Sequence, residues 1–154
     1  MPAGQVGHRN RILFAAGALL GIAVFLLVFG GSSLDVTNDA FCRGGYMEKD
    51  IQQHYAGWMF YRESSTTWPL CVADSINAPD GLSVAYPDSI PLAAALLRPM
   101  AAALGGTFQY FGWFTLLCYA LQGGFGALLC GLFTNGLAAP LLGDLLFVTS
   151  PVLL

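Results

Sequence analysis

Between Arg98 and Asp144 the sequence contains no charged residue. A soluble domain needs charged side chains spread over its surface, and about a quarter of its residues are charged. Here 10% of the residues are charged and 56% are hydrophobic. The uncharged stretch therefore predicts helices covered by lipid, with the bilayer as a partner. The net charge of −3 offers no basic surface for a phosphate backbone, so we expect no nucleic acid partner.

Three apolar stretches are candidates for membrane helices. Residues 12–34 contain no charged residue and exceed the roughly 20 residues that a bilayer crossing requires. Residues 108–133 are long enough for a second crossing, and residues 137–154 begin a third after a short polar turn. We therefore expect an all-α transmembrane fold. Close packing between its helices would be permitted by Gly123, Gly124, Gly126 and Gly131.

The charges beside the first helix predict its orientation. Arg9 and Arg11 precede it, and basic residues are enriched on the cytoplasmic side of membrane helices. The helix is also longer than the apolar core of a cleaved signal peptide, which favours an uncleaved anchor. Residues 35–89 are then external, and they contain eight acidic residues against three basic ones. We expect a multi-pass protein of the cytoplasmic (inner) membrane with a cytoplasmic N-terminus and a large first external loop.

The external loop should contain a helix over residues 48–63, because only Gly57 interrupts the helix-forming residues there. One face, which we expect at the level of the lipid headgroups, carries Ile51, Tyr55, Trp58, Met59 and Arg62. The opposite face carries Asp50, His54, Gly57 and Tyr61. Residues 64–87 are rich in turn-forming residues, and we assign no strand there.

A second external helix is predicted over residues 90–104. Asp88 precedes it at a position where a carboxylate caps a helix, and Pro91 suits the first turn. Arg98 and Pro99 in its middle make a full crossing of the bilayer costly. We therefore expect this helix to be interfacial or re-entrant.

Asp50 and His54 form the strongest candidate for chemistry. A carboxylate and an imidazole four residues apart share a helix face, where they could act as base or metal ligand. Gln53 and Trp58 lie beside them in the sequence. The alternative is that Asp50 only stabilises the helix N-terminus and that His54 is a solvated surface residue. Spacing alone does not decide between these interpretations.

Four further polar residues each have a functional and a structural interpretation. Asp39, shortly after the first helix, would meet a divalent metal ion or a pyrophosphate-bearing lipid, or would cap a helix or act only as a topological acid. Asp88 would join the site or cap the following helix. Arg98 would bind a lipid phosphate or extend its charge to the interface. Asp144, within apolar sequence, would be functional or lie near the inner interface.

The four cysteines lack the C-x-x-C spacing of a zinc site. Cys118 and Cys130 lie in apolar sequence, where a thiol packs as a small hydrophobic group. Cys42 and Cys71 lie in the external loop, where an oxidising compartment would permit a disulfide between them. Free thiols are the alternative.

Six short segments carry a resemblance to known proteins: residues 50–58 (DIQQHYAGW), 60–62 (FYR), 68–70 (WPL), 86–92 (YPDSIPL), 108–112 (FQYFG) and 121–123 (LQG). They resemble segments of an uncharacterised family of bacterial multi-pass membrane proteins. The resemblance covers most of residues 50–151. That family is in turn similar to the GT-C glycosyltransferases, which have many membrane helices and use sugars carried on a polyprenyl phosphate.

The resemblance implies a GT-C-like fold with interfacial helices in the first external loop. It also implies transfer of a sugar from a polyprenyl-phosphate donor to an acceptor outside the cytoplasmic membrane. Asp50 would be base or metal ligand, with a divalent metal ion as candidate cofactor, and His54 would orient Asp50 or bind phosphate. Further substrate contacts would come from Gln53, Trp58, Asp88 and Arg98.

GT-C enzymes have more helices than this sequence provides, so we expect an N-terminal portion of a larger enzyme. The alternative is a non-enzymatic polytopic membrane protein, such as a transporter, a polysaccharide-export component or a scaffold. A transporter would be expected to carry polar residues or broken helices near the middle of the bilayer, as well as an internal repeat, and the sequence of these helices shows neither.

Overall fold

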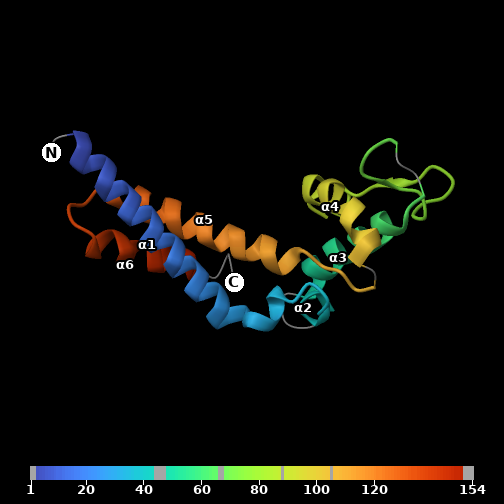
Figure 1. Ribbon diagram of the computed structural model, residues 1–154, viewed down its shortest axis with the longest axis horizontal. Helices are drawn as coiled ribbons and strands as arrows, with labels where there is room; N and C mark the ends of the chain where they lie inside the picture. Colours follow the sequence, from blue (N-terminus) through green and yellow to red (C-terminus); the bar gives the residue numbers. More distant parts are fainter. Residues whose placement is uncertain (1–2, 44–47, 66–67, 88, 105, 151–154) are drawn as a thin grey trace. The chain divides into compact units, whose positions relative to one another are not determined.

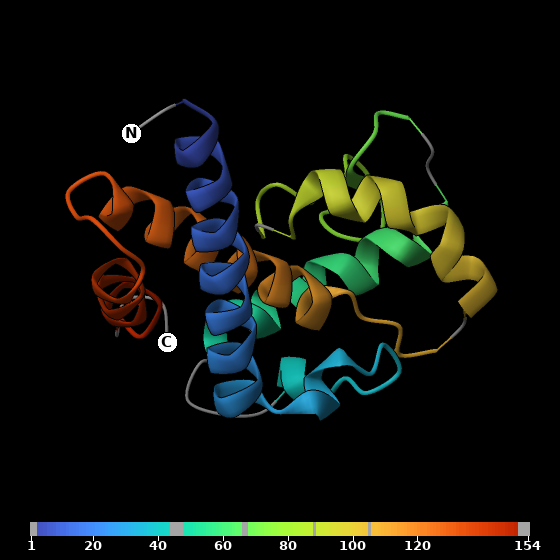
Figure 2. The ribbon, with the colours of Figure 1, turned by 60° about the vertical axis from the view of Figure 1, so that its left-hand side comes forward.

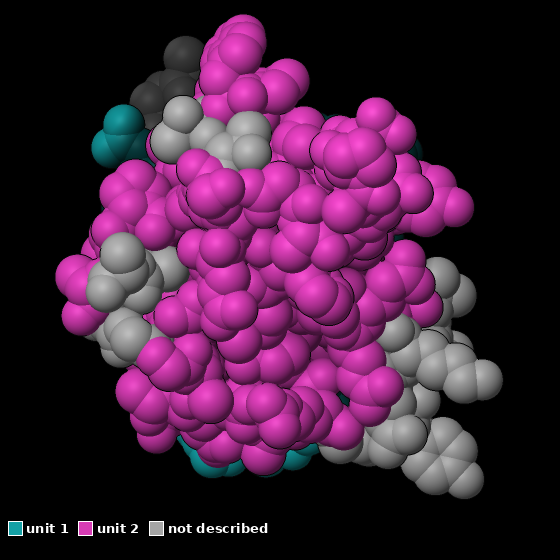
Figure 3. All heavy atoms as spheres, turned by 90° about the vertical axis from the view of Figure 1, so that its right-hand side faces the viewer, with its two compact units in different colours: residues 1–32, 112–154 teal, residues 33–111 magenta. Residues whose placement is uncertain are grey.

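The computed structural model describes residues 3–43, 48–65, 68–87, 89–104 and 106–150 (Figure 1). This part of the chain is mostly helical, as predicted. The chain divides into two compact units, which Figure 3 distinguishes by colour. Unit 1 consists of Met1–Ser32 and Gly112–Leu154, and unit 2 consists of Ser33–Phe111.

The helices of unit 1 are α1 (Ala3–Phe29), nearly all of α5 (Phe111–Gly131) and α6 (Ala138–Val148). Both α1 and α5 are long and apolar enough to cross a membrane. The 21 residues of α5 measure about 31 Å, against about 30 Å for the hydrocarbon core. α1 ends earlier than the predicted range, because Gly30 takes a left-handed conformation with a φ of 73° and a short 3-10 helix, η1 (Gly31–Leu34), follows.

The two long helices of unit 1 touch through glycine. A Cβ on Gly17 would overlap the carbonyl oxygen of Gly123, and a Cβ on Gly123 would overlap that of Gly17. Gly21 meets the backbone of Tyr119 in the same way. Gly21 comes after Gly17 in α1, whereas its partner Tyr119 comes before Gly123 in α5, so the two helices are antiparallel. The other three glycines predicted to allow close packing also lie against neighbouring side chains, which confirms that prediction.

Arg9 of α1 binds the chain at the end of α5. Its Nη2 donates to the carbonyl oxygens of Gly131 at 2.9 Å and Thr134 at 2.6 Å, and its Nε donates to that of Gly136 at 3.3 Å. The end of a helix has unpaired carbonyl groups and the negative end of the helix dipole. Arg9 therefore stabilises this end of α5. Its position before the first apolar stretch also predicts a cytoplasmic N-terminus.

α6 is shorter than the range predicted for the third helix. Its 11 residues measure about 16 Å, roughly half of a bilayer crossing. It ends at Val148, where the Thr149 N–H bonds back to the carbonyl oxygen of Leu145. Ser150 precedes a proline in the sequence, and a residue before proline disfavours the helical conformation. Residues 151–154, the rest of the predicted range, lie outside the described residues.

Unit 2 contains α2 (Ala40–Arg43), α3 (Glu48–Glu63) and α4 (Pro91–Leu104). The bounds of α3 coincide with the range predicted from the sequence, and those of α4 differ from it by one residue. α3 and α4 pack against each other, as Figure 2 shows. A small antiparallel hairpin of β1 (Val72–Ala73) and β2 (Leu82–Ser83) lies where we assigned no strand. Two residues per strand are too few to produce an alternating pattern in the sequence.

The aromatic face of α3 lies in the core of unit 2. Trp58 is 0% exposed, and its Nε1 donates to the carbonyl oxygen of Phe108 at 2.9 Å. The ring of Tyr110 meets that of Trp58 edge to face, with centroids 5.1 Å apart. Tyr55 is also buried and packs against Phe111. The expectation that this face lies at the lipid headgroups is therefore wrong for Tyr55 and Trp58, because Phe108, Tyr110 and Phe111 cover it.

Gln109 joins the two ends of unit 2. Its side chain is 0% exposed, and Nε2 donates to the carbonyl oxygens of Ser33 at 3.0 Å and Asp35 at 2.9 Å. Its backbone N–H donates to the carbonyl oxygen of Val36 at 2.8 Å. We predicted Gln109 within the second membrane helix, but α5 begins only at Phe111. Gln109 instead holds the first and last segments of unit 2 side by side.

Candidate functional site

His54 lies on α3 and is held by the loop that precedes α4. Its Nδ1 is 3.0 Å from the carbonyl oxygen of Pro87. A carbonyl oxygen only accepts, so Nδ1 carries the proton in this contact. In the neutral ring, Nε2 then keeps its lone pair and is the acceptor. A backbone carbonyl that fixes one ring nitrogen in this way leaves the other oriented to act as base or ligand.

Gly57 and Ser89 fix this loop on α3. A Cβ on Gly57 would overlap Ser89 Oγ and the ring of Pro87, so glycine is required for the close approach. Ser89 Oγ donates to the carbonyl oxygen of His54 at 2.9 Å. The residues on both sides of Asp88 are therefore held next to His54. Asp88 itself, which we predicted to join the site or cap α4, lies outside the described residues.

Asp50 and Gln53 are exposed on the same helix as His54. Asp50 precedes His54 by four residues, a spacing that places two side chains on one helix face with Cβ atoms about 6 Å apart. The structure thus keeps three of the predicted site residues together on α3 and brings the loop around Asp88 to one of them. The group combines an imidazole acceptor, a solvated carboxylate and an amide.

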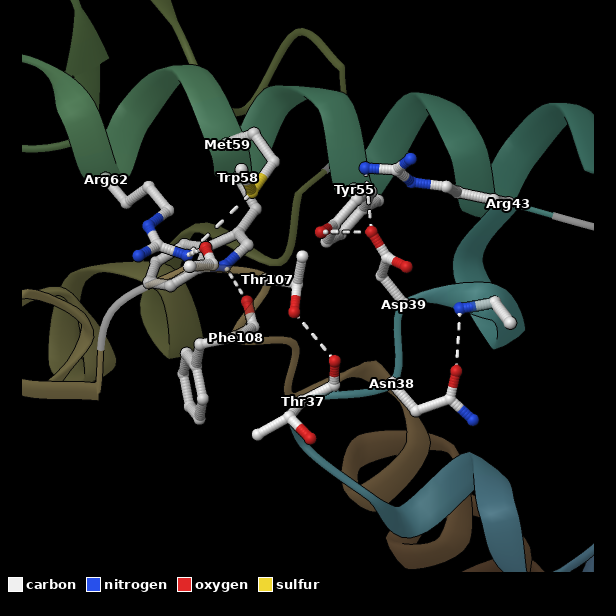
Figure 4. A network of polar contacts seen from close by, with 12 residues as sticks. Thr37, Asn38, Asp39, Arg43, Tyr55, Trp58, Met59, Arg62, Thr107 and Phe108 are labelled. Atoms are coloured by element: carbon white, nitrogen blue, oxygen red, sulfur yellow. Dashed lines mark hydrogen bonds and ion pairs between the residues drawn. The ribbon is translucent and has the colours of Figure 1, made fainter.

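Asp39 is engaged in a separate polar cluster, shown in Figure 4. Its Oδ2 is 2.7 Å from Arg43 Nη2 and accepts a hydrogen bond from Tyr55 OH at 3.3 Å. Burial raises the pKa of Tyr55, and the charge of Asp39 raises it further. Burial also raises the pKa of the Cys42 thiol to about 12, with a smaller contribution from Asp39. Tyr55 and Cys42 therefore stay protonated at neutral pH, and Asp39 has structural partners.

A preformed metal site is not seen in the part of the chain that the structure describes. Its residues include no group of three or more His, Cys, Asp or Glu side chains that could hold a metal ion. Asp39 is paired with Arg43, and Asp50 is exposed to solvent. Magnesium, however, is commonly bound through one or two carboxylates together with the phosphates of a substrate. Asp50 has the exposure that this mode of binding requires.

Trp58 and Arg98 have partners inside unit 2. The buried ring of Trp58 offers no face on which a sugar could stack, so the predicted sugar contact is absent from this structure. The guanidinium of Arg98 lies 4.7 Å from the centroid of the Tyr61 ring, and Nη2 donates to the carbonyl oxygen of Ser64. These contacts account for an arginine in the middle of α4. A contact of Arg98 with a lipid phosphate stays a prediction.

Cys42 and Cys71 do not form a disulfide. Cys42 is a buried free thiol, and Cys71 is half-buried and also free. The Sγ of Cys71 lies 3.4 Å from the carbonyl oxygen of Pro91, to which it donates. The alternative of free thiols is the one that the structure shows.

Ser89 and Tyr110 support the site and were not identified from the sequence. The hydroxyl of Tyr110 donates to the carbonyl oxygen of Ser89 at 2.6 Å, in the buried interior of unit 2. Burial raises the pKa of Tyr110, so the hydroxyl stays a donor. No local signal identifies this pair, because Ser89 resembles a residue at a helix start and Tyr110 continues an apolar stretch.

Unit 1 has an apolar groove between α1 and α6. It is lined only by alanine and leucine, namely Ala16, Leu19, Leu20, Ala138, Leu141, Leu142 and Leu145. A lining of this kind suits a hydrocarbon chain and has no charged group that would hold a phosphate. The groove therefore adds no catalytic residue.

One comparison with known proteins, that with family profiles, finds a match over most of the chain. No curated protein and no solved structure matches it. The sequence profile of a domain of unknown function, DUF6311, matches residues 18–154, which include all of unit 2. The chain therefore belongs to the DUF6311 family.

Proposed function

We propose that this chain forms part of a GT-C-like glycosyltransferase of the bacterial cytoplasmic membrane. The enzyme would transfer a sugar from a polyprenyl-phosphate donor to an acceptor outside the cytoplasm. The observation that carries the proposal is the orientation of His54 by the carbonyl oxygen of Pro87, beside an exposed carboxylate on the same helix. General acid–base chemistry requires a proton acceptor that is fixed in this way.

The topology supports an external position for the site. α1 and α5 are antiparallel. If both helices cross the membrane, as we propose, residues 33–111, which join them, begin and end on the same side of it. Arg9 and Arg11 near the start of α1 favour a cytoplasmic N-terminus. Unit 2 then lies outside, where a lipid-linked donor would present its sugar.

The residues of α3 have distinct roles in the proposal. Asp50 accepts the proton of the acceptor hydroxyl, or holds a divalent ion against the donor phosphate. In the neutral ring, His54 Nε2 accepts a hydrogen bond from the acceptor hydroxyl, and in its protonated form it donates one to Asp50 or to phosphate. Gln53 supplies an amide for sugar hydroxyls. Arg98 stays a candidate for the lipid phosphate.

The test is a transfer assay in membranes that contain the protein in its natural length, with a radiolabelled polyprenyl-phosphate sugar. We expect Asp50→Asn to lower transfer by about 100-fold or more while membrane abundance stays normal, because an amide does not accept the proton. Asp80→Asn is the matched control, since Asp80 is an exposed aspartate outside the group on α3. Full activity in Asp50→Asn would exclude this assignment.

One observation favours the non-enzymatic alternative, a transporter. α6 is about half the length of a bilayer crossing and carries a buried carboxylate, Asp144. Interrupted helices and polar residues within the bilayer are typical of transporters. Uptake or export measured in the same membranes, with Asp50→Asn unaffected and Asp144→Asn inactive, would support this alternative over the glycosyltransferase.

A further inference from the structure

Asp144 is a buried carboxylate that the proposed transfer reaction does not use. It lies on α6 and is 0% exposed. Its Oδ1 occupies the space that a Cβ on Gly126 of α5 would fill. Gly126 therefore provides a recess on α5 into which the carboxyl group fits, so that α6 packs closely against α5 at this point.

Neither oxygen of this carboxyl group has a hydrogen-bond partner among the residues that the structure describes. An ionised carboxylate buried among apolar groups is strongly unfavourable without a cation or several donors. The contact therefore requires either a compensating group or loss of the charge.

The neighbouring helices supply no compensating charge. α5 has no charged residue, and Cys130, which packs against Gly143, is the titratable side chain nearest in sequence to Gly126. α1 carries His8, Arg9 and Arg11 near its start, but Arg9 binds carbonyl oxygens at the end of α5. None of these side chains has a hydrogen bond or ion pair to Asp144 among the described residues.

The ligand that fits is a proton. A metal ion or the cationic side chain of another helix would need open space next to the oxygens, and both oxygens are covered. A proton needs no additional space, removes the charge, and turns one oxygen into an O–H donor. We propose that Asp144 is a proton-binding site within unit 1, at which the neutral carboxylic acid allows α6 to pack on Gly126. The proposal is independent of sugar transfer.

Infrared spectroscopy of the whole protein in lipid bilayers tests this proposal. Aspartate labelled with ¹³C at the side-chain carboxyl distinguishes the seven aspartates from the glutamates and the C-terminus. At about pH 5.5, where exposed aspartates are almost fully ionised, we expect the C=O band of a protonated carboxylic acid in addition to the carboxylate bands, and we expect Asp144→Asn to lack it. Carboxylate bands alone in the unmodified protein, or an acid band that persists in Asp144→Asn, would overturn the proposal.

Asp35→Asn is the matched control. Asp35 is exposed and accepts hydrogen bonds from the backbone N–H and the hydroxyl of Thr37, which lower its pKa. This variant should lose carboxylate intensity and keep the acid band. If Asp144→Asn does not accumulate, the acid band is assigned by elimination, by changing each of the other aspartates to asparagine in turn. A band that disappears with any of those changes would contradict the assignment to Asp144.

Discussion

Replacement of Trp58 by phenylalanine tests whether unit 2 is organised around this side chain. Trp58→Phe removes the Nε1–H that bonds the carbonyl oxygen of Phe108 at 2.9 Å, in a site that is 0% exposed. A buried carbonyl left without its donor costs about 1–3 kcal/mol. A central value of about 2 kcal/mol corresponds to a fall of about 8–16 °C in the melting temperature of a unit of this size.

The assay uses the buried thiol of Cys42 as a reporter for the opening of unit 2. Cys42 is 1% exposed and belongs to the same core as Trp58. In a variant whose other three cysteines are replaced by serine, a maleimide dye that fluoresces on reaction would record the temperature at which Cys42 becomes accessible. The dye is used in detergent with the whole protein, and unit 1 contributes no thiol to the signal in this variant.

Trp68→Phe is the matched control, because Trp68 is 76% exposed. We expect its melting temperature to equal that of the parent within the error of the measurement. The reasoning is refuted if Trp58→Phe melts with the parent, or if Trp68→Phe falls as far as Trp58→Phe. Either result would mean that the buried hydrogen bond does not determine the stability of unit 2.

Two further predictions concern the helix crossing and the buried thiol. Gly123→Val should prevent the close approach of α5 to Gly17 and lower the melting temperature in detergent, whereas Gly7→Val, at a site with open space, should have little effect. Because the pKa of Cys42 is raised to about 12 in the folded state, the folded protein keeps a proton that the unfolded chain loses from about pH 9 upward. The contribution of the protonated Cys42 thiol to the free energy of unfolding is complete below pH 9 and is lost as the pH rises to about 12. The free energy of unfolding of Cys42→Ala, measured with denaturant, should therefore depend less on pH over this range than that of the parent.

The helices could be predicted from the sequence where clear breaks bound them. α3 lies between a glycine pair and a stretch rich in serine and threonine, and α4 begins at Pro91, so the sequence indicates both ranges. The start of α5 could not be predicted, because the aromatic side chains of Phe108 and Tyr110 resemble those of the apolar helix that follows. Burial against Trp58 and burial in lipid select the same residue types, so the sequence does not distinguish them.

The candidate site could be predicted only in part, for a similar reason. The spacing of Asp50 and His54 follows from helical periodicity and is a local property of the sequence. The contact of His54 with Pro87 joins α3 to an irregular loop that comes 33 residues later. No periodicity connects such segments, and Gly57, which makes the contact possible, is visible in the sequence only as a weak point in a helix.

The hydrogen bonds of Gln109 hold the first and last segments of unit 2 together, which affects how unit 2 can vary in length. Gln109 bonds the carbonyl oxygens of Ser33 and Asp35, and Thr107 Oγ1 donates to that of Thr37 at 2.7 Å. Unit 2 thus begins and ends at one point, like a domain inserted into a turn. An insertion with adjacent ends can grow, shrink or be exchanged without changing the separation of the segments that flank it. The sequences of unit 1 and unit 2 can therefore diverge at different rates.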